Sequence, residues 1–527
     1  MLSRRELIRL ATLSAGLQAI SHKAYSQTSF KESLFKLGVA SGAPTPDGVV
    51  LWTKLVSDSV FGFGNQPIDV TWQVAHDERF ERIALQGTTA GLPQLGHAVH
   101  AELRGLQADR WYFYRFIVGS GVNAQISDVG RTRTAPAIGA KVGNLRFAFA
   151  SCQRWEHGYY SAYRQLVLDN PDLVVFLGDY IYEYASPKIL PTNFVRGHNL
   201  RKAVTLADYR DRYALYKSDP FLQAAHRACP WLITWDDHEV QNDYATDQSE
   251  GLTPQADFLI QRAAAYQAFY EHMPLPANAL VRGLAGLGQN DGVRVNQRVA
   301  WGDLANFHLL DCRQFRDYQV CPRPNRAGSN MVKPAECPEL QNTNRSMLGK
   351  PQETWLAEGL ALDAKQGMAS QPLPWSILAQ TTLLAKINAP AGKEQRVWTD
   401  GWEGYPFAKK RLLESMQAQP SLHPIILSGD VHLNVVANVD NAATEFCGTS
   451  LTSQTGWHPE RESSFYGDNP QVQYLNSEKR GYAMAEVTPK LWTTTLMGVA
   501  DVKSESSATT AIAKFAVERG NKTPAKM

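Results

Sequence analysis

The chain lacks any apolar run of about 20 residues, the length that a helix needs to cross a bilayer. It also lacks a polybasic run, and 53 basic against 51 acidic residues leave a formal net charge of only +2. These absences exclude a stable membrane span and argue against a dedicated nucleic-acid or membrane surface. What remains is an ordinary globular composition over 527 residues, with enough core for two or three domains.

The first residues have the pattern of an export signal. The pair Arg4 and Arg5 precedes an uncharged stretch at residues 10–20, and Ala24 suits a signal-peptidase site. We therefore expect residues 1–26 to be a twin-arginine signal peptide, with the twin-arginine export machinery as a partner and a periplasmic or secreted mature protein. A frayed N-terminal helix is the alternative. Removal of these residues takes away four basic and one acidic side chain, which leaves a net charge near −1.

Cysteine is scarce, with six residues in the whole chain. In an exported protein some cysteines are expected to pair. Cys321 and Cys337 flank a loop rich in Pro, Asn and Gly, so the sequence predicts a disulfide between them. The remaining cysteines are Cys152, Cys229, Cys312 and Cys447.

Two different residue patterns divide the chain into domains. Residues 27–136 contain short segments rich in Val, Trp and Tyr between turn residues, such as GVVLWTKL and RWYFYRFIVG. The last of these is similar to the late strands of a fibronectin-type fold, so we expect an antiparallel β-sandwich. Residues 144–500 alternate apolar strands with helical stretches such as ADFLIQRAAAYQAFYEHM, which predicts an α/β layered domain. Residues 501–527 are expected to form a C-terminal tail that includes a short helix.

Four apolar runs of the α/β region end in side chains that can bind metals. The runs are LRFAFASC, DLVVFLGDYIY, WLITWDDHEVQN and HPIILSGDVH. Sites in open α/β sheets gather at the carboxyl ends of strands about 4.8 Å apart, so these side chains can converge if the runs share one sheet. The side chains delivered by the four ends are Cys152, Asp179, Tyr182, Asp236, Asp237, His238, Asn242, Asp430 and His432.

Each of these ends has an ordinary structural explanation when taken alone. A Gly-Asp pair after a strand is usually a turn, and a free cysteine is usually a small buried hydrophobic side chain. Four such ends together are hard to explain by packing. An ionised carboxylate such as Asp179 needs a partner when buried, and Arg154 is the only arginine or lysine close to these ends in sequence. The pattern therefore indicates a bound cation.

The motifs at the strand ends resemble those of a known family. Gly178–Tyr182 has the pattern G-D-x-x-Y, Asp236–Glu239 has D-D-H-E, and Gly429–His432 has G-D-x-H. These motifs are similar to the set found in PhoD-type alkaline phosphatases and phosphodiesterases, which are calcineurin-like metallophosphoesterases related to purple acid phosphatases. The resemblance covers most of the mature chain. It implies an αββα metallophosphoesterase domain after the β-sandwich, and a hydrolase acting on ester bonds.

The resemblance also implies the ligands of a first metal, ferric iron (Fe3+). Asp179 would bridge this metal to a second one, and Tyr182 would bind iron as a phenolate. The complete set of implied iron ligands is Cys152, Asp179, Tyr182 and His432.

A second metal is implied next to the iron. Asp237 and Asp430 would hold it, since they occupy the positions of an Asn and a His in the purple phosphatases. Two carboxylates make this site hard and oxygen-rich, which favours calcium (Ca2+) or a similar cation over zinc. Asp236 and Asn242 are either further calcium ligands or braces that orient the ligands.

The implied chemistry is the release of phosphate from a phosphate-ester substrate. Two cations would hold the phosphoryl oxygens and lower the pKa of a bound water, so that metal hydroxide attacks phosphorus. His238, which matches the histidine of a G-N-H motif, would protonate the leaving oxygen, and Arg154 would clamp a phosphate oxygen. An ordinary ion-pair arginine is the competing interpretation of Arg154.

Three alternatives stay open. The same metals would serve phosphodiesters or phospholipids, as in a phospholipase D-like enzyme, because the metals do not select the ester. Cys152 would be the nucleophile if the chain were a cysteine hydrolase, but this hypothesis leaves Asp179 and Asp430 without a role. An exported binding protein without enzymatic activity would contain no stoichiometric metal.

Overall fold

The chain forms two compact units in the computed structural model, which describes residues 33–57, 62–280, 293–366, 373–387, 394–456 and 469–527. The signal peptide expected at residues 1–26 lies outside these described residues. The first unit comprises Met1–Pro136, Tyr213–Trp231 and Tyr266–Arg294. The second unit comprises Ala137–Arg212, Leu232–Ala265 and Val295–Met527.

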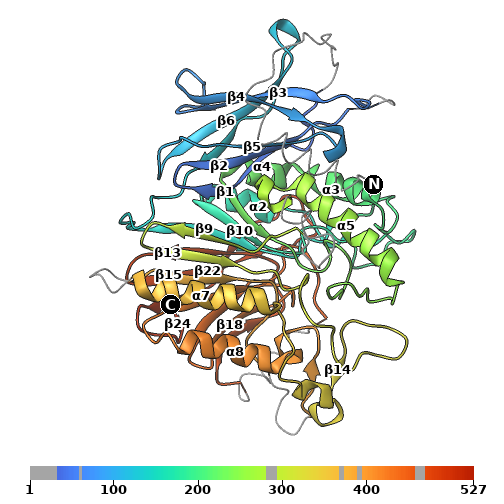
Figure 1. The fold of residues 1–527 in the computed structure, drawn as a ribbon, viewed down its shortest axis with the longest axis vertical. Helices are drawn as coiled ribbons and strands as arrows, with labels where there is room; N and C mark the ends of the chain where they lie inside the picture. Colours follow the sequence, from blue (N-terminus) through green and yellow to red (C-terminus); the bar gives the residue numbers. More distant parts are fainter. Residues whose placement is uncertain (1–32, 58–61, 281–292, 367–372, 388–393, 457–468) are drawn as a thin grey trace. The chain divides into compact units, whose positions relative to one another are not determined.

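The first unit is an antiparallel β-sandwich, as the sequence predicts. Its strands are β1 (Val39–Thr45), β2 (Gly48–Lys54), β3 (Ile68–Ala75), β4 (Ile83–Gly91), β5 (Ala98–Glu102), β6 (Trp111–Val118), β7 (Gln125–Ile126) and β8 (Gly130–Arg133). One layer has the order β4-β3-β6-β7 with β8 also paired to β6, and the other is formed by β1, β2 and β5 (Figure 1). Leu51 and Val99 of the second layer share a buried core with Val74 and Tyr114 of the first.

The second unit is built on two sheets. In spatial order, the strands of its first sheet are β24 (Ala525–Lys526), β23 (Thr509–Glu518), β22 (Leu491–Val499), β21 (Gly481–Val487), β9 (Leu145–Ala150), β10 (Leu173–Leu177) and β11 (Trp231–Thr234). Those of its second sheet are β12 (Gln297–Trp301), β13 (Ala305–Leu309), β15 (Trp375–Ala379), β17 (Pro424–Ser428), β19 (Ala443–Cys447), β18 (Asn434–Val439) and β20 (Val472–Asn476). Parallel pairing joins β9 to β10 and runs from β13 through β15 and β17 to β19, as strand–helix alternation predicts.

Aromatic side chains join the two sheets face to face. The ring of Phe147 on β9 lies 5.3 Å from that of Phe307 on β13. Trp492 on β22 lies 5.8 Å from Trp375 on β15 and 6.4 Å from Phe446 on β19. Because each buried ring removes a large apolar area from water, these contacts make the space between the sheets the core of the unit.

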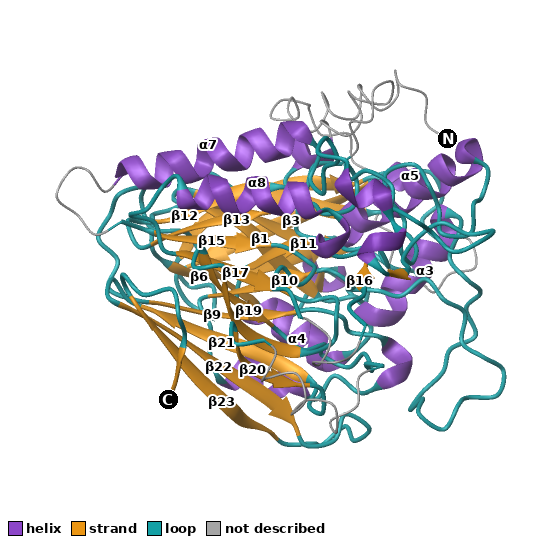
Figure 2. Ribbon diagram, turned by 90° about the horizontal axis from the view of Figure 1, so that it is seen from below, coloured by secondary structure: helices purple, strands orange, loops and turns teal. Residues whose placement is uncertain are grey.

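Helices α7 (Lys350–Gln366) and α8 (Pro406–Gln417) lie side by side over the outer face of the second sheet (Figures 1 and 2). Leu360 of α7 and Met416 of α8 share a core with Leu378 of β15 and Ile426 of β17. The helix that the sequence predicts from ADFLIQRAAAYQAFYEHM is present as α5 (Gln255–His272), and α2 (Ala162–Leu168) is a further helix. The other regular elements described are α3 (Leu206–Lys217), α4 (Pro220–Ala228), and the paired strands β14 (Met331–Val332) and β16 (Val397–Trp398).

The prediction of a short helix at the C-terminus is wrong. Residues 509–518 form β23, which pairs antiparallel with β22 along its length, and β24 extends the sheet to Lys526. The alanines of this segment favour a helix locally, but buried Ala513, Phe515 and Val517 follow the two-residue period of a strand. The segment after residue 501 therefore contributes to the sheet of the second unit, because β22 offers it a long edge for pairing.

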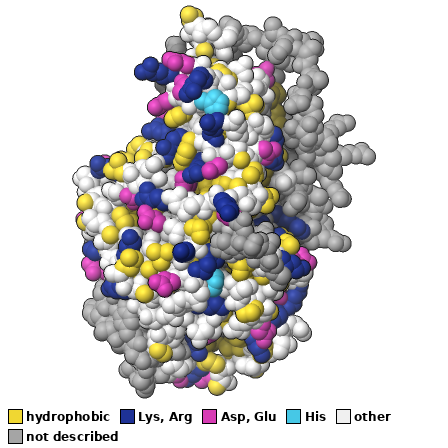
Figure 3. Space-filling view, turned by 90° about the vertical axis from the view of Figure 1, so that its left-hand side faces the viewer, with side chains coloured by type: hydrophobic (Ala, Val, Ile, Leu, Met, Phe, Trp, Pro, Cys, Tyr) yellow, Lys and Arg dark blue, Asp and Glu magenta, His cyan; other side chains and the backbone are white. Residues whose placement is uncertain are grey.

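The apolar character of the helices and the distribution of charge on the surface agree with the amino-acid composition. None of the helices in the described part of the chain has both the length and the apolar character that a bilayer crossing requires. On the face drawn in Figure 3, basic and acidic side chains are interspersed rather than gathered by sign.

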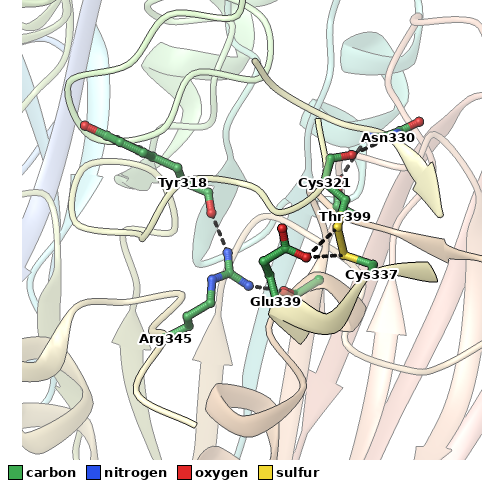
Figure 4. The surroundings of a disulfide bond; sticks show 8 residues. Tyr318, Cys321, Asn330, Cys337, Glu339, Arg345 and Thr399 are labelled. Carbon is green, nitrogen blue, oxygen red and sulfur yellow. Dashed lines mark hydrogen bonds between the residues drawn. A yellow bond between two sulfur atoms is a disulfide. The ribbon is translucent and has the colours of Figure 1, made fainter. Parts of the chain in front are cut away.

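The predicted disulfide between Cys321 and Cys337 is confirmed (Figure 4). It closes a loop across a sequence separation of 16 residues. Within this loop the Asn330 side chain donates a hydrogen bond of 2.8 Å to the Cys321 carbonyl oxygen. The free cysteines among the described residues are all buried, namely Cys152, Cys229, Cys312 and Cys447.

Loss of this disulfide is expected to lower the free energy of unfolding. Replacing Cys321 and Cys337 together by serine frees the loop in the unfolded chain, and a loop of this size corresponds to about 3 kcal/mol. Urea unfolding of the wild type and the double variant measures the difference. Reductant should lower the stability of the wild type alone. Equal stability of the wild type and the double variant in the absence of reductant would contradict the prediction.

Candidate metal centre

The four ligand-bearing strand ends meet where the two sheets of the second unit converge. Three of them follow β9, β10 and β11, which are consecutive in the first sheet. The fourth follows β17, so the four runs do not share one sheet. A parallel bridge between Ser151, just after β9, and Ser450, just after β19, links the two sheets at this edge. The convergence therefore depends on how the sheets face each other, not only on the order of strands within one sheet.

Two glycines permit the close approach of these ends. A Cβ at Gly178 would lie 2.5 Å from the backbone nitrogen of Asp236, and a Cβ at Gly429 would collide with the side chain of Ser151. Gly178 also has a φ of +86°, which residues with a side chain rarely adopt. The glycine of each Gly-Asp pair is thus required by the segment that packs against it.

Ligand-type residues at the site have left-handed backbone conformations. The φ angles are +57° at Cys152, +56° at Asp179, +61° at Asp430 and +56° at His432. Each such residue costs about 1–2 kcal/mol relative to a right-handed conformation. Strained backbone of this kind concentrates at functional sites, where the surrounding structure holds it in place.

One group of side chains combines sulfur, oxygen and nitrogen. Potential ligand atoms of Cys152, Asp179 and His432 all lie within 4.8 Å of one another. The hydroxyl of Tyr182 donates to Asp179 Oδ2 at 2.9 Å and lies 3.2 Å from His432 Nε2. All four side chains that the resemblance assigns to iron are therefore together.

A second group shares a member with the first. Potential ligand atoms of Asp179, Asp237 and His238 also lie within 4.8 Å of one another. Asp179 therefore belongs to both groups, and it is the only residue common to the two that are described at this site. Asp430 is in neither of these two groups of ligand atoms. Burial raises the pKa of Asp430, and the nearby charges of Asp236 and Asp237 raise it further.

The carboxylates fit a cation because several of their oxygens have nothing else to bind. Among the residues that the structure describes, Asp179 Oδ1, Asp236 Oδ2 and Asp430 Oδ2 are buried and have no hydrogen-bond partner. Burial raises the pKa of Asp179 and of Asp430 well above the usual range of a carboxyl group, and neighbouring carboxylates raise both further. Buried charges of one sign require compensation, and a multivalent cation supplies it.

The environment of Cys152 disfavours a free nucleophilic thiolate. Burial raises the pKa of its thiol well above the usual range, and the charge of Asp179 raises it further. His432 does lie beside it, but burial lowers the pKa of His432 to about 3. Reactive cysteines have the opposite setting, with a lowered pKa and partial exposure. A cysteine hydrolase is therefore the weaker interpretation of this group.

The orientation of His432 is set by a backbone contact. Its Nδ1 lies 2.6 Å from the carbonyl oxygen of Gln454, which places the proton on Nδ1. Nε2 is then left to face Tyr182 and the first group of side chains. An imidazole held in this way by its other nitrogen is typical of metal-binding histidines.

Arg313 is a second basic side chain near the strand ends, close to them in space although it is far from them in sequence. Its Nε donates to Asp236 Oδ1, and its terminal nitrogen lies 3.7 Å from Asp237 Oδ1. Although burial acts to raise the pKa of Asp237, the charges of Arg313 and His238 lower it to about 2. Arg313 follows a fifth strand end, that of β13, and a charged residue after this apolar run is the sequence signal that could have found it.

Glu239 is a second residue that sequence reasoning missed. Its carboxylate accepts hydrogen bonds from the backbone N–H groups of Asp179 at 3.1 Å, Tyr180 at 2.6 Å and Asp236 at 2.8 Å. One buried side chain thus clamps the turn after β10 to the turn after β11. Glu239 is the last residue of the D-D-H-E motif, so the motif itself contains it. The sequence does not show that it bonds to Asp179 and Tyr180, because these residues lie about sixty positions away.

The remaining predicted site residues lie at the margin of the two groups. The Arg154 guanidinium is 3.2 Å from Glu156 Oε2 and 5.6 Å from the centre of the Tyr182 ring. The Asn242 side chain donates to Glu250 Oε1 at 2.9 Å. Asp236 accepts from the hydroxyl of a threonine after β15 at 3.1 Å, in addition to its contact with Arg313. Asp236 is outside the two groups of convergent carboxylate, imidazole and thiol ligand atoms at this site.

Comparison with known proteins identifies the family. The family model described as PhoD-like phosphatase matches residues 147–496, and that described as PhoD-like phosphatase, N-terminal domain, matches residues 20–136. The chain belongs to the PhoD-like phosphatase family. Alkaline phosphatase D of Bacillus subtilis (strain 168) is 40% identical to it over 502 residues, which cover 92% of this chain and 81% of that protein. A solved structure of PhoD has a TM-score of 0.85 and 37% identity, and the match covers 95% of this chain and 93% of that one.

Membership of the PhoD-like phosphatase family confirms the resemblance read from the motifs. It also confirms the expected fold class, a β-sandwich followed by an α/β metallophosphoesterase-type domain, and the expected class of enzyme, a phosphoester hydrolase. The identities of the metals and the roles of individual residues are separate questions, which depend on the geometry above.

Gly178→Ala is expected to destabilise the protein more than the same change at a matched glycine. Gly105 has a similar φ of +88° but open space where a Cβ would be, so Gly105→Ala carries only the backbone cost of about 1–2 kcal/mol. At Gly178 the new methyl group also meets Asp236, for a total of about 2–5 kcal/mol. Urea unfolding of both variants measures this. An equal loss at the two positions would show that the strand ends do not require the close approach.

Proposed function

We propose that the chain is an exported, metal-dependent alkaline phosphatase that releases phosphate from phosphate esters. The observation that carries this proposal is the position of Asp179 in both groups of ligand-type side chains. A carboxylate shared in this way suits two adjacent cations, since each of its oxygens can bind one of them. Catalysis belongs to the domain that begins near residue 144, preceded by the N-terminal domain of residues 27–136.

The two groups suit two different cations. We assign ferric iron (Fe3+) to the group with sulfur, imidazole and phenol, formed by Cys152, Asp179, Tyr182 and His432. We assign calcium (Ca2+) to Asp179, Asp237 and Asp430, whose oxygens are hard ligands. Asp236 acts as a brace, because Arg313 already neutralises it, and Asn242 supports the loop through Glu250.

The chain's own residues provide binding and proton transfer. When bound, the two cations neutralise phosphoryl oxygens and lower the pKa of water. His238 lies beside Asp179 and Asp237, where its ring can give a proton to the leaving oxygen of the ester. Arg154 lies over the rings of Tyr182 and Tyr184, where its guanidinium can donate to a phosphate oxygen.

Export through the twin-arginine route is the localisation that we propose, to the periplasm or the cell exterior. Arg4 and Arg5 are the sequence basis for it. The disulfide between Cys321 and Cys337 supports it, because structural disulfides persist mainly in oxidising compartments.

A phosphodiesterase or phospholipase D-like activity is the second candidate, because the ligand groups leave the ester unspecified. Rates on p-nitrophenyl phosphate and on bis-p-nitrophenyl phosphate distinguish the two candidates. We expect faster turnover of the monoester. Exclusive turnover of the diester would replace the monoesterase proposal.

Asp179→Asn is expected to remove metal and activity together. The amide keeps the size of the side chain but loses the charge that both cations share, so at least one site should empty. Elemental analysis and hydrolysis of p-nitrophenyl phosphate are the measurements. Asp363→Asn is a matched control, since Asp363 is a buried carboxylate on α7 that bonds to Asn306, His308 and Ser376 instead. Full metal content in Asp179→Asn would rule out the bridging role.

Tyr182→Phe is expected to abolish any visible absorption band of the iron-loaded protein. A phenolate bound to ferric iron produces such a band by charge transfer, and phenylalanine has no oxygen to bind. Absorption spectra at equal iron content test this. Tyr184→Phe is the control, because Tyr184 contacts His238 and Arg154 rather than the iron group. An unchanged spectrum in Tyr182→Phe would contradict the assignment.

A further inference from the structure

The ring of His238 is held by three consecutive residues that the D-D-H-E motif does not include. Its Nδ1 lies 2.8 Å from Glu183 Oε2. The rings of Tyr182 and Tyr184, on either side of that glutamate in sequence, contact it at centroid distances of 4.1 Å and 5.3 Å. The segment Tyr182–Tyr184 therefore restricts both the position and the rotation of the imidazole.

Glu183 is itself fixed with both oxygens engaged. It is fully buried, and its Oε1 accepts the backbone N–H of Asn242 at 3.1 Å. The same carboxylate thus joins the ring of His238 to the turn that follows it. Because Glu183 occupies Nδ1, the nitrogen left to face Asp179 and Asp237 is Nε2.

We propose that Glu183 is the positioning residue that aims Nε2 of His238 at the leaving-group oxygen of the phosphate ester. This inference rests on the proposed function and adds to it the residue that makes His238 competent. A carboxylate on the far nitrogen of an imidazole holds one proton on that nitrogen and fixes the direction of the ring, so the second proton of the imidazolium is delivered from Nε2.

The proton transfer balances without any further reactant. The oxygen of water forms the new bond to phosphorus, and the ester P–O bond breaks with its electron pair going to the leaving oxygen. His238 enters the step as an imidazolium, with one proton on Nδ1 held by Glu183 and a second on Nε2. The proton on Nε2 passes to that oxygen and releases an alcohol. The proton that water gives up returns the ring to its imidazolium form, so His238 and Glu183 end the cycle unchanged.

Glu183→Gln tests this role because an amide has only one acceptor oxygen. The two donors that meet Glu183, Nδ1–H of His238 and N–H of Asn242, bond to its two separate oxygens. In the variant one donor therefore faces the amide NH2 group. Glu183→Asp keeps both acceptors on a shorter side chain, so it should restore part of the function.

The kinetic test compares two leaving groups in the metal-loaded full-length enzyme. An alkoxide needs a proton as it leaves, whereas p-nitrophenolate is stable without one. Glu183→Gln should lower kcat about 10–100-fold on glycerol phosphate but by less than about threefold on p-nitrophenyl phosphate. Glu183→Asp should lie between the wild type and Glu183→Gln. An equal loss on both substrates, or no loss on either, overturns the inference.

A double variant shows whether Glu183 acts through His238. His238→Ala should reproduce the leaving-group pattern with a larger loss, and adding Glu183→Gln to it should change kcat by less than about twofold. A further drop in the double variant overturns the inference, because Glu183 would then act by another route.

A measurement that does not use activity follows the ring itself. Nitrogen NMR of histidine-labelled full-length chain, without added metal, distinguishes protonation at Nδ1 from protonation at Nε2. At a pH above its pKa, where the ring carries a single proton, the His238 signal, assigned by its loss in His238→Ala, should show that proton on Nδ1 in the wild type and lose this preference in Glu183→Gln. An unchanged His238 signal overturns the inference.

Asp363→Asn is the control for the loss of a buried carboxylate beside a histidine. His308 Nε2 lies 2.8 Å from Asp363 Oδ2, the same distance as in the pair formed by His238 and Glu183, but outside the ligand groups. This variant should leave the ratio of the two rates unchanged. A changed ratio overturns the inference by showing that the ratio reports general damage. A metal-loaded wild type that hydrolyses neither ester would refute the proposed function together with this inference. An active wild type whose variants do not follow the expected pattern would refute the role of Glu183 alone.

Discussion

Repulsion among buried carboxylates is the constraint on which the candidate metal centre of the second unit depends. Asp179, Asp237 and Asp430 follow three different strands and lie in one buried region, where the charge of Asp237 adds to the effect of burial and raises the pKa of the other two. Arg313 compensates one side of this region, through Asp236 and Asp237. The free oxygens of Asp179 and Asp430 find no such partner among the described residues. This imbalance explains why the site suits cations, and why removing a single carboxylate charge would affect more than one ligand.

The backbone around these carboxylates is arranged to hold them in place. Gly178 and Gly429 let neighbouring turns approach more closely than any side chain would permit. Glu239 then ties the turns after β10 and β11 together through three backbone N–H groups. Support also comes from the disulfide loop, because the backbone N–H of Ser329 donates to the Asp243 carboxylate at 2.9 Å and that of Asp243 donates to Asp237 at 2.6 Å. The strain of the left-handed residues at this site is thus balanced by contacts from several distant segments.

Much of the fold and of the candidate site was predictable, and the exceptions have common causes. The β-sandwich, the α/β domain and the disulfide between Cys321 and Cys337 followed from local patterns of apolar, turn and cysteine residues. The C-terminal strand β23 did not, because its alanines favour a helix and only the edge of β22 selects the strand. The roles of Arg313 and Glu183 were missed for a similar reason. Their partners are distant in sequence, and a charged residue looks the same whether it is solvated or buried against another charge.

The sequence by itself determined which kinds of side chain stand at the ends of the strands, because a strand's apolar run and the residues that follow it are local and can be read directly. It therefore indicated a cation site and its candidate ligands. Only the tertiary structure decided that β17 meets the others from a facing sheet, that Asp179 is the residue common to both described ligand groups, and that Arg313 neutralises Asp236. These facts depend on distances between segments far apart in the chain, and such distances are set by the packing of the two sheets rather than by any local pattern.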